Sequence, residues 1–282
     1  MQLLSKADEV TTLVQVAKSK NLSVGFVPTM GALHKGHISL VRRAKKENDI
    51  VIVSIFVNPT QFNDKKDLEK YPRTLDQDIQ ALKPTKVDIV FAPDVSEIYP
   101  DGDKKGSEID LGGLDKMMEG AFRPGHFNGV AQVVKRLLDI VNPDRLYMGQ
   151  KDFQQFTIIQ HMIDTLHLPV HMVVCPIMRE ENGLAMSSRN VRLTSTTRSN
   201  AGIIYKTLKS AKSKLKTHTI GNINAEAMKS LSTGPFEPVY FEIVDGNTLQ
   251  PIHDASKHDY IVACTAVWAD GVRLIDNHIL KS

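Results

Sequence analysis

The chain has 282 residues, of which 41% are hydrophobic and 24% are charged, and its formal net charge is +3. This length favours one large domain with a smaller one, and the weak charge argues against nucleic-acid binding. Charges within the first ten residues, and the lack of an apolar stretch near ~20 residues, predict neither a signal peptide nor a membrane span.

The two cysteines, Cys175 and Cys264, each lie inside an apolar run. Such positions favour buried free thiols over a disulfide framework, which is typical of a reducing compartment. We therefore expect a cytoplasmic protein with no membrane partner.

The first two-thirds of the chain alternate short β-branched runs with longer amphipathic stretches. We expect strands at residues 24–28, 50–57, 87–92, 145–148 and 171–177. We expect helices at residues 6–20, 36–47, 67–82, 130–141 and 153–166. This alternation predicts an α/β fold with a doubly wound parallel sheet. Long loops, which in compact domains are usually functional or mobile, are predicted at residues 58–66 and 93–125.

The last third of the chain has a different character. It begins with a polar loop at residues 178–190 and a Lys/Ser-rich helix at 194–217, followed by a turn signal at Gly221-Asn222. Three β runs follow at residues 239–244, 260–268 and 272–276. The last two are joined by a turn that contains the hairpin dipeptide Asp270-Gly271. We predict a large domain over residues 1–177 and a second, smaller α+β domain over 178–282.

The segment PTMGALHKGH connects the strand that ends at Pro28 to a helix that begins near His37. Ligands of open α/β sheets bind beyond the carboxyl ends of the strands, and a helix N-terminus presents free N–H groups to phosphate. His34 and His37 could donate hydrogen bonds to phosphoryl oxygens, and Gly36 would let the backbone approach closely. For an isolated H-x-G-H motif, a surface turn is an equally good interpretation. Zinc binding would need further ligands that the sequence does not supply.

A second segment, MGQKDFQQF, follows the predicted strand at residues 145–148 and opens another helix. Lys151 offers a compact positive charge to phosphate, although a surface lysine explains it equally well. Asp152 is a candidate helix N-cap or ribose ligand. Gln154 and Gln155 are helical neighbours, so they cannot both face inward.

Three further segments gain weight only in combination. FVNPTQF places the neutral amides of Asn58 and Gln61 after a strand, which suits a hydroxy acid or an amine. MSSRN offers two hydroxyls and the guanidinium of Arg189 to phosphates. RPGHFNGV brings His126 to a helix start. Taken alone, each segment is an ordinary loop or turn.

The motifs PTMGALHKGH, FVNPTQF, YPRT, GHFNGV, GQKDFQQ and MSSRN follow one another over residues 24–192. In this order they resemble the pantothenate synthetase (pantoate–β-alanine ligase) family, one of the nucleotidyltransferases with a His-Ile-Gly-His-like signature. The resemblance implies a Rossmann-like sheet. Residues 186–189 resemble the Lys-Met-Ser-Lys-Ser-like loop of that wider group, although Ala185 and Arg189 stand where the general motif has lysines.

The resemblance implies a two-step reaction with ATP as a substrate and Mg²⁺ as a cofactor. The carboxylate of (R)-pantoate would attack the α-phosphate of ATP, which releases pyrophosphate and leaves pantoyl adenylate. The amine of β-alanine would then attack the acyl carbon, which gives pantothenate and AMP. The resemblance further implies a homodimer in which the C-terminal domain acts as a lid.

Residue roles also follow from the resemblance. His34 and His37 would contact the ATP phosphates, with His37 as the general acid, and Lys151 and Arg189 would assist in catalysis. The pantoate and β-alanine would be bound by Gln61, Gln155 and Asn58. The nucleotide would be bound by the two histidines together with Met30, Gly31, Gly149, Lys151, Asp152, Met178, Met186, Ser187, Ser188 and Arg189.

Several alternatives stay open. Asp76 and Asp78 are candidate magnesium ligands, but they are equally well explained as early-helix acids that face the helix dipole. The competing functions are a nucleotidyltransferase that leaves the nucleotide on a phosphate or sugar, and a nucleotide-binding regulator without activity. FVNPTQF and GQKDFQQ argue against the first. The metal ligands, the dimer interface and the role of His126 are not fixed by the sequence.

Overall fold

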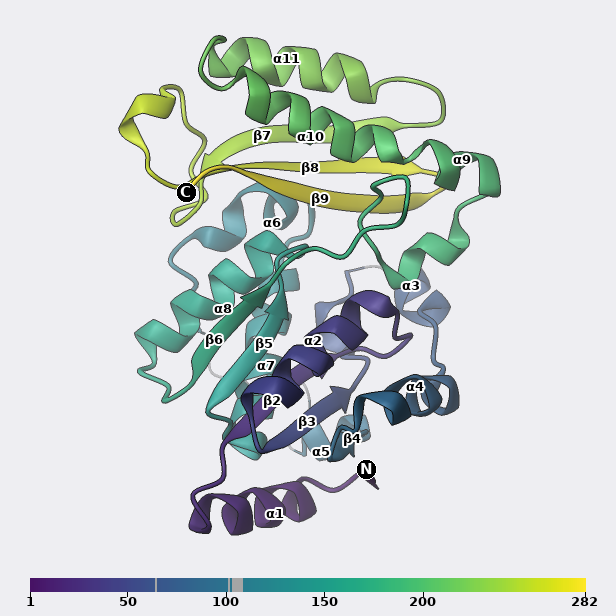
Figure 1. The fold of residues 1–282 in the computed structure, drawn as a ribbon, viewed down its shortest axis with the longest axis vertical. Helices are drawn as coiled ribbons and strands as arrows, with labels where there is room; N and C mark the ends of the chain where they lie inside the picture. Colours follow the sequence, from purple (N-terminus) through teal and green to yellow (C-terminus); the bar gives the residue numbers. More distant parts are fainter. Residues whose placement is uncertain (64, 101, 103–108) are drawn as a thin grey trace. The chain divides into compact units, whose positions relative to one another are not determined.

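The computed structural model describes residues 1–63, 65–100, 102 and 109–282, and these form two compact units (Figure 1). Unit 1 comprises Met1–Asp115, Arg123–Gly149 and Gln155–Cys175. Unit 2 comprises Lys116–Phe122, Gln150–Gln154 and Pro176–Ser282. Unit 2 therefore includes two short segments from earlier in the chain.

Unit 1 is built on a six-stranded sheet in which all neighbouring strands pair in parallel, in the order β1-β4-β3-β2-β5-β6. Its strands are β1 (Gln2–Leu4), β2 (Val24–Thr29), β3 (Ile50–Ile55), β4 (Ile89–Phe91), β5 (Arg145–Gly149) and β6 (His171–Cys175). The predicted parallel sheet is confirmed. The short edge strand β1 gave no signal in the sequence.

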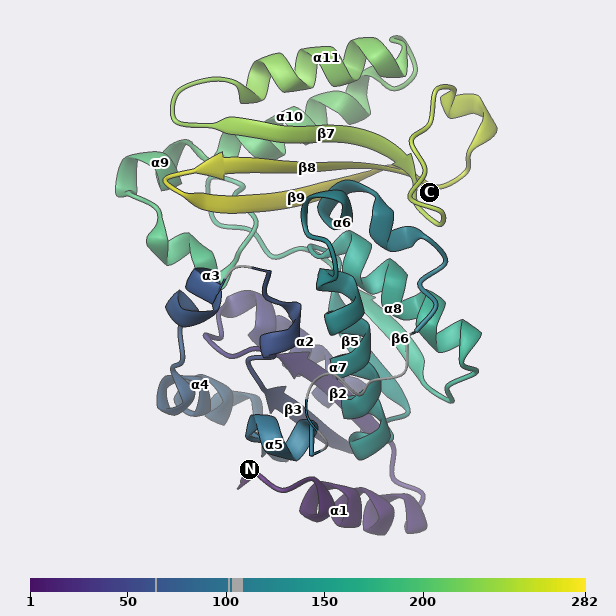
Figure 2. The ribbon, with the colours of Figure 1, turned by 180° about the vertical axis from the view of Figure 1, so that it is seen from behind.

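Helices lie on both faces of this sheet. Figure 1 shows α2 in front of the strands, and Figure 2 shows α7 in front of them when the molecule is seen from behind. On the α2 face, Leu40, Val41 and Ala44 pack in one apolar cluster with residues of β2 and β3. The helices of unit 1 are α1 (Ala7–Ser19), α2 (Lys35–Glu47), α3 (Lys65–Lys70), α4 (Leu75–Leu82), α5 (Val95–Ile98), α7 (His126–Val141) and most of α8 (Phe153–Thr165).

The order of the strands reverses at β2, which pairs with β3 on one side and with β5 on the other. In open α/β sheets, ligands bind at such a point, beyond the carboxyl ends of the strands. Residues 30–37, which we call the histidine loop, follow β2 and lead into α2. The fold therefore places the histidine loop where a ligand is expected.

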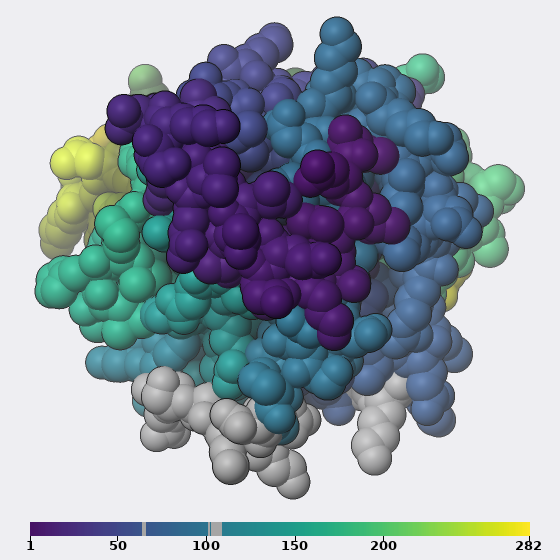
Figure 3. All heavy atoms as spheres, turned by 90° about the horizontal axis from the view of Figure 1, so that it is seen from below, coloured from purple at the N-terminus to yellow at the C-terminus, as the bar shows by residue number. Residues whose placement is uncertain are grey.

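The first residues of the chain form an edge strand of the sheet, β1, and the start of α1. β1 pairs with β4, and the Ala7 N–H donates to Glu97 Oε1 at 2.8 Å, while Lys6 Nζ lies 3.1 Å from Glu97 Oε2. The hydrogen bond from Ala7, and then the Lys6 ammonium, lower the pKa of the Glu97 carboxyl. Figure 3 shows the atoms of β1 and α1, in purple, covering part of this end of unit 1.

One helix prediction in unit 1 is wrong, and a second, which is confirmed as a helix, has the wrong start. The single helix expected at residues 67–82 is broken, because α3 ends at Lys70 and α4 begins at Leu75. Pro72 lies between them, and a proline lacks an N–H and restricts the residue before it. The second error concerns α7, which begins at His126 and not at residue 130, so GHFNGV forms its first turns.

The two predicted long loops contain short helices. The segment 58–66 holds the 3-10 helix η1 (Pro59–Gln61) and the start of α3, and the segment 93–125 holds α5 and α6 (Met118–Phe122). Residue 64 of the first segment, and residues 101 and 103–108 of the second, lie outside the described residues.

Unit 2 contains a three-stranded antiparallel sheet of β7 (Glu237–Asp245), β8 (Ile261–Ala269) and β9 (Val272–Lys281), in that order. Asp270 and Gly271 connect β8 to β9 with φ angles of 50° and 68°. Positive φ at both central residues is typical of a type I′ turn, which matches the twist of a hairpin. The predicted Asp-Gly hairpin and the smaller α+β fold are confirmed.

Two helices, α10 (Gly202–Lys214) and α11 (Ile220–Leu231), pack against the unit 2 sheet. The single helix predicted at residues 194–217 is wrong, because α9 (Ser195–Asn200) and α10 are separate. The turn predicted at Gly221-Asn222 is also wrong, since both residues lie inside α11. Thr219 Oγ1 accepts from the Asn222 N–H at 3.2 Å, and this N-cap starts the helix.

The two early segments of unit 2 are attached to the sheet by buried polar contacts. Glu119 of α6 is 2.8 Å from Arg273 Nη2 of β9 and accepts a hydrogen bond from the hydroxyl of Tyr240. Burial, and then the charge of Glu119, raise the pKa of Tyr240. Gln154 Oε1 accepts from the Glu119 N–H, and Gln154 Nε2 donates to the carbonyl of Met117. Gln154 is therefore a structural residue.

Two of the general sequence predictions can be compared with the structure. Cys175 and Cys264 are both buried and free, as predicted, and burial raises the pKa of each thiol. Over the described part of the chain, no helix is both long enough and apolar enough to cross a membrane.

Candidate active site

The histidine loop leaves β2 through two residues with left-handed backbone conformation. Gly31 has a φ of 80° and Ala32 a φ of 48°. A Cβ atom on Gly31 would lie 3.0 Å from both Asp78 Oδ2 and Ile55 Cγ2. Both the φ angle and the close approach therefore favour glycine at position 31, and a larger residue there would be strained.

Asp78 of α4 holds this loop in place. Its side chain accepts hydrogen bonds from the Ala32 N–H at 3.0 Å and from the Leu33 N–H at 2.7 Å, and Thr74 Oγ1 lies 3.3 Å away. Asp78 is only 2% exposed. Because its two oxygens are used by the backbone of the loop, Asp78 is an anchor of the histidine loop.

The acids at the start of α4 belong to no larger cluster of metal-ligating side chains within the described ranges. Across the described residues, no group of three or more His, Cys, Asp or Glu side chains could hold a metal ion. Asp76 is exposed, whereas Asp78 is buried against the histidine loop.

His34 and His37 form a reciprocal cap at the N-terminus of α2. His34 is the N-cap residue, and its Nδ1 accepts from the Gly36 N–H at 3.1 Å. The His34 N–H lies 3.3 Å from Nδ1 of His37, and the two ring centroids are 4.0 Å apart. Because both Nδ1 atoms act as acceptors, the neutral form of each ring carries its proton on Nε2. This spacing explains why the motif has two residues between its histidines.

A second cluster lies around η1, after β3. Asn58 is 1% exposed, and its Nδ2 donates to Gln61 Oε1 at 3.3 Å and to the carbonyl of Gly129 at 3.1 Å. Its Oδ1 accepts from the hydroxyl of Tyr99 at 2.8 Å. Gln61 Nε2 lies 3.2 Å from Met30 Sδ. The structure thus brings Asn58, Gln61 and Met30 together.

The first turn of α7 packs directly on this cluster. Nδ1 of His126 is 2.7 Å from the carbonyl of Gln61, and a Cβ atom on Gly129 would lie 2.5 Å from the carbonyl oxygen of Thr60. No larger residue than glycine fits at position 129. His126 and Gly129 therefore position Gln61. The positioning roles of Tyr99, Gly129 and Asp78 were not predicted from the sequence, in which Gly129 stood just before the expected helix start at residue 130.

Unit 2 carries most of the remaining predicted residues, and these lie in two segments. In residues 150–152, which we call the 150–152 loop, Lys151 Nζ is 3.3 Å from Asp152 Oδ1. Residues 178–189, the 178–189 segment, start with a narrow hairpin in which the Met186 N–H donates to the carbonyl of Met178 at 2.9 Å. Ser187 then caps the 3-10 helix η4 (Ser188–Arg192), since its Oγ accepts from the Arg189 N–H.

The predicted residues are thus divided between the units. Unit 2 carries Lys151, Asp152, Met178, Met186, Ser187, Ser188 and Arg189. Unit 1 carries Met30, Gly31, His34, His37, Asn58, Gln61, Gly149 and Gln155.

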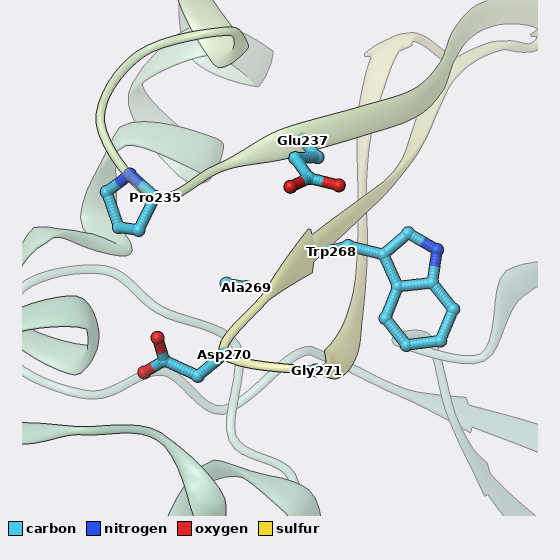
Figure 4. A pocket seen from close by; sticks show the side chains of 6 residues that line it. All are labelled: Pro235, Glu237, Trp268, Ala269, Asp270 and Gly271. Carbon is cyan, nitrogen blue, oxygen red and sulfur yellow. The ribbon is translucent and has the colours of Figure 1, made fainter.

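Unit 2 also has an open hollow of about 390 Å³ at the end of the β8–β9 hairpin. Figure 4 shows Glu237 and Trp268 on the paired strands β7 and β8, with Asp270 in the turn. The carboxylates of Glu237 and Asp270 disfavour an anionic ligand in this hollow. The Asp270 side chain also accepts a hydrogen bond from the Thr194 N–H at 2.9 Å. This hollow contains none of the predicted residues, and its charge does not suit a triphosphate.

Comparison with known proteins gives full-length matches. A family model described as pantoate-beta-alanine ligase matches residues 2–279. The pantothenate synthetase of Bacteroides fragilis is 47% identical over 278 residues, which cover 98% of both chains. That of Azobacteroides pseudotrichonymphae is 49% identical over 279 residues, which cover 98% of this chain and 99% of the relative.

Solved structures agree with these matches. The pantothenate synthetase of Thermus thermophilus has a TM-score of 0.92 at 39% identity, with 100% of both chains covered. A pantoate-beta-alanine ligase of Francisella tularensis, solved in complex with beta-gamma ATP and beta-alanine, has a TM-score of 0.81 at 37% identity, with 100% of this chain and 98% of that chain covered. The six motifs, the parallel sheet with its histidine loop and these matches lead to one conclusion: the chain belongs to the pantoate-beta-alanine ligase family.

Proposed function

We propose that the chain condenses pantoate with β-alanine at the expense of ATP, through a pantoyl adenylate. A carboxylate oxygen of pantoate bonds to the α-phosphorus as the bond to the pyrophosphate oxygen breaks. The amine of β-alanine then bonds to the acyl carbon and loses a proton, and AMP leaves. Activation is needed because a carboxylate is a poor acyl donor, whereas its mixed anhydride with phosphate has a good leaving group.

The reciprocal cap of His34 and His37 is the observation that carries this proposal. With both Nδ1 atoms accepting backbone N–H groups, each neutral ring has Nε2–H as its donor. Two such donors at a helix N-terminus, beyond the carboxyl end of β2, suit the phosphates of ATP. Their hydrogen bonds would stabilise the charge that builds on the α-phosphate in the transition state. As a neutral ring whose Nδ1 is an acceptor, His37 would stabilise the leaving pyrophosphate through a hydrogen bond from Nε2–H, without giving up its only ring proton.

The cluster around η1 supports pantoate as the acid. Asn58 fixes the amide of Gln61 by donating to its Oε1, and His126 contacts the carbonyl of the same residue. An amide held in one orientation offers a donor and an acceptor at defined places, which suits the hydroxyl and carboxylate groups of a hydroxy acid. We assign Gln61 and Gln155 to pantoate, with Gln61 also orienting β-alanine and Asn58 in support.

The remaining roles are proposed from the resemblance of the motifs. Met30, Gly31 and Gly149 of unit 1, and Lys151, Asp152, Met178, Met186, Ser187, Ser188 and Arg189 of unit 2, would contact ATP. Mg²⁺ would enter with ATP as part of the substrate, with phosphates and water as its main ligands, because the described residues form no cluster that could hold it alone. The homodimer, the lid role of the C-terminal part and the cytoplasmic location stay predictions.

Exchange of labelled pyrophosphate into ATP tests the proposal. We expect exchange that depends on pantoate and needs no β-alanine, because the adenylate forms in the first step. AMP release should then require β-alanine. If exchange is absent with pantoate, or proceeds equally without it, the proposed reaction is wrong.

A further inference from the structure

Two adjacent polar residues of β9, Asp276 and Asn277, are almost completely buried, with exposures of 4% and 1%. Asp276 pairs with Thr265 of β8, and Asn277 pairs with Cys264. Consecutive residues of a strand point to opposite faces of the sheet. The two side chains therefore contact different parts of unit 2.

Asn277 holds the 150–152 loop. Its Nδ2 donates to the carbonyls of Gln150 and Lys151, both at 2.9 Å, and its Oδ1 accepts from Gln150 Nε2 at 3.1 Å. One side chain thus satisfies two consecutive backbone carbonyls. This fixes the backbone from which the Lys151 side chain extends.

Asp276 holds the 178–189 segment from the other face. Its two oxygens accept from Arg179 at 2.6 Å and 3.0 Å, which is a bidentate pair. The same guanidinium donates to the carbonyl of Gly183 at 3.0 Å and lies 3.6 Å from the ring centroid of Tyr205. Arg179 thereby connects the narrow hairpin of the 178–189 segment to β9.

We propose that Asp276 and Asn277 are positioning residues for ATP, because consecutive residues of one strand hold the two unit 2 segments that carry its predicted ligands. A strand is stiff, so this attachment fixes the spacing between the 150–152 loop and the 178–189 segment before ATP binds. Donors that are held at a fixed spacing bind a triphosphate without a further ordering cost. The inference rests on the proposed function for the identity of the ligand.

Hydrogen–deuterium exchange of the full-length protein without substrates tests the positioning directly. We expect Asn277→Ala to speed exchange in a peptide that covers residues 150–154 and to leave residues 178–190 unchanged. Asp276→Asn should have the reverse pattern. The matched control is Thr265→Val, which removes a buried hydrogen bond to the carbonyl of Tyr240 on the neighbouring strand. Equal loosening of both segments in all three variants would mean that β9 acts only through general stability, and would overturn the proposal.

Kinetics then separate positioning of ATP from a purely structural role. We expect Asn277→Ala to raise the KM for ATP about tenfold in pyrophosphate exchange, with the KM for pantoate and kcat changed less than about twofold. Thr265→Val should leave all three within about twofold. An unchanged KM for ATP in Asn277→Ala would refute the assignment.

If Asn277→Ala does not fold, Gln150→Ala removes only the contact to Asn277 Oδ1 and is expected to raise the KM for ATP about twofold to threefold. No change in that variant, in the KM for ATP or in exchange at residues 150–154, would also count against the assignment. If the wild-type protein shows no pantoate-dependent pyrophosphate exchange, only the proposed function is refuted. The deuterium measurement needs no substrate, so it still tests whether Asp276 and Asn277 hold the two segments.

Discussion

The histidine loop of unit 1 and the 178–189 segment of unit 2 are held by opposite kinds of contact. In the histidine loop, backbone N–H groups donate to one buried carboxylate, that of Asp78. In the 178–189 segment, a backbone carbonyl accepts from one partly buried guanidinium, that of Arg179, which is itself paired with Asp276. Within the part of the chain that the structure describes, Asp78 pairs with no charged side chain. In the 178–189 segment, by contrast, the anchor is an ion pair in which Arg179 and Asp276 stabilise each other.

The contrast shows which groups of each segment are committed to internal contacts. Asp78 accepts from the N–H groups of Ala32 and Leu33, so in the histidine loop the proposed contacts with phosphate come from the imidazoles. In the 178–189 segment, Arg179 is committed to Asp276 and the carbonyl of Gly183, so Arg189 is the arginine proposed for the phosphates. In both cases the anchoring residue and the proposed ligand residue are distinct.

The largest loss of stability is expected when Arg179 is removed from its ion pair with Asp276. Arg179→Met leaves Asp276, which is 4% exposed, without its counter-charge. Removing one partner of a buried pair costs about 3–5 kcal/mol. We expect a loss of this size in the free energy of unfolding at neutral pH, measured by urea denaturation.

The free energy of unfolding of the same variant should depend on pH more strongly than that of the wild type. Burial raises the pKa of Asp276, and in the wild type Arg179, together with the more distant charge of Lys151, opposes this. The folded pKa lies above the unfolded value of about 3.9 already in the wild type, and loss of Arg179 raises it further. The folded state then keeps a proton that the unfolded state loses, so stability falls as the pH rises from about 4 toward the folded pKa. A variant whose stability is flat over this range would show that Asp276 does not depend on the pair.

Replacing His37 is expected to have a slightly smaller effect in free energy, and it should act on kcat. His37→Ala should lower kcat for pyrophosphate exchange by about 10²–10³, as for loss of a transition-state donor, with the fold intact by circular dichroism. His37→Asn keeps an acceptor near the position of Nδ1 but has no group at Nε2, so it should be almost as slow. If His37→Asn were close to wild type, the ring would serve only as a cap.

Asp78→Asn tests the anchor of unit 1. The amide group would put a donor against the N–H of either Ala32 or Leu33, which leaves a buried group unsatisfied and costs about 1–3 kcal/mol. We expect unfolding to be easier by this amount and kcat to fall about tenfold, because the histidines follow directly. Asp76→Asn, on the exposed side of α4, should have the smaller effect. Equal losses in both variants, restored by added Mg²⁺, would instead favour metal binding by these acids.

The segments to which ligand residues are assigned could be predicted from the sequence because they are local patterns. PTMGALHKGH combines the end of an apolar run, two glycines and a helix start, and it does lie between β2 and α2. Anchors are not local. Asp78 is 46 residues from Ala32, and Asp276 is 97 residues from Arg179. From the sequence, Asp78 was equally well an early-helix acid or a metal ligand, because its partners are backbone groups of a distant loop.

Polar residues also led to wrong predictions for the end of β9 and the start of α11. The last strand was expected to end at residue 276, but β9 continues to Lys281, because Asp276 and Asn277 are buried by partners that no local pattern reveals. In the same way, Gly221-Asn222 resembled a turn because the N-cap of Thr219 was not recognised. Tertiary contacts decided the first case, and an unrecognised cap decided the second.

The smallest effect is expected from Gln61, where the contacts are neutral. Gln61→Ala removes an amide that is oriented by Asn58 and lies near Met30. Loss of one neutral hydrogen bond corresponds to about 0.5–1.5 kcal/mol, so we expect the KM for pantoate to rise about tenfold and the KM for ATP less than about twofold. Initial rates of pyrophosphate exchange at varied pantoate and ATP measure both. The opposite pattern would assign Gln61 to the nucleotide, and the division of unit 1 into a phosphate loop and an acid-binding cluster would then be wrong.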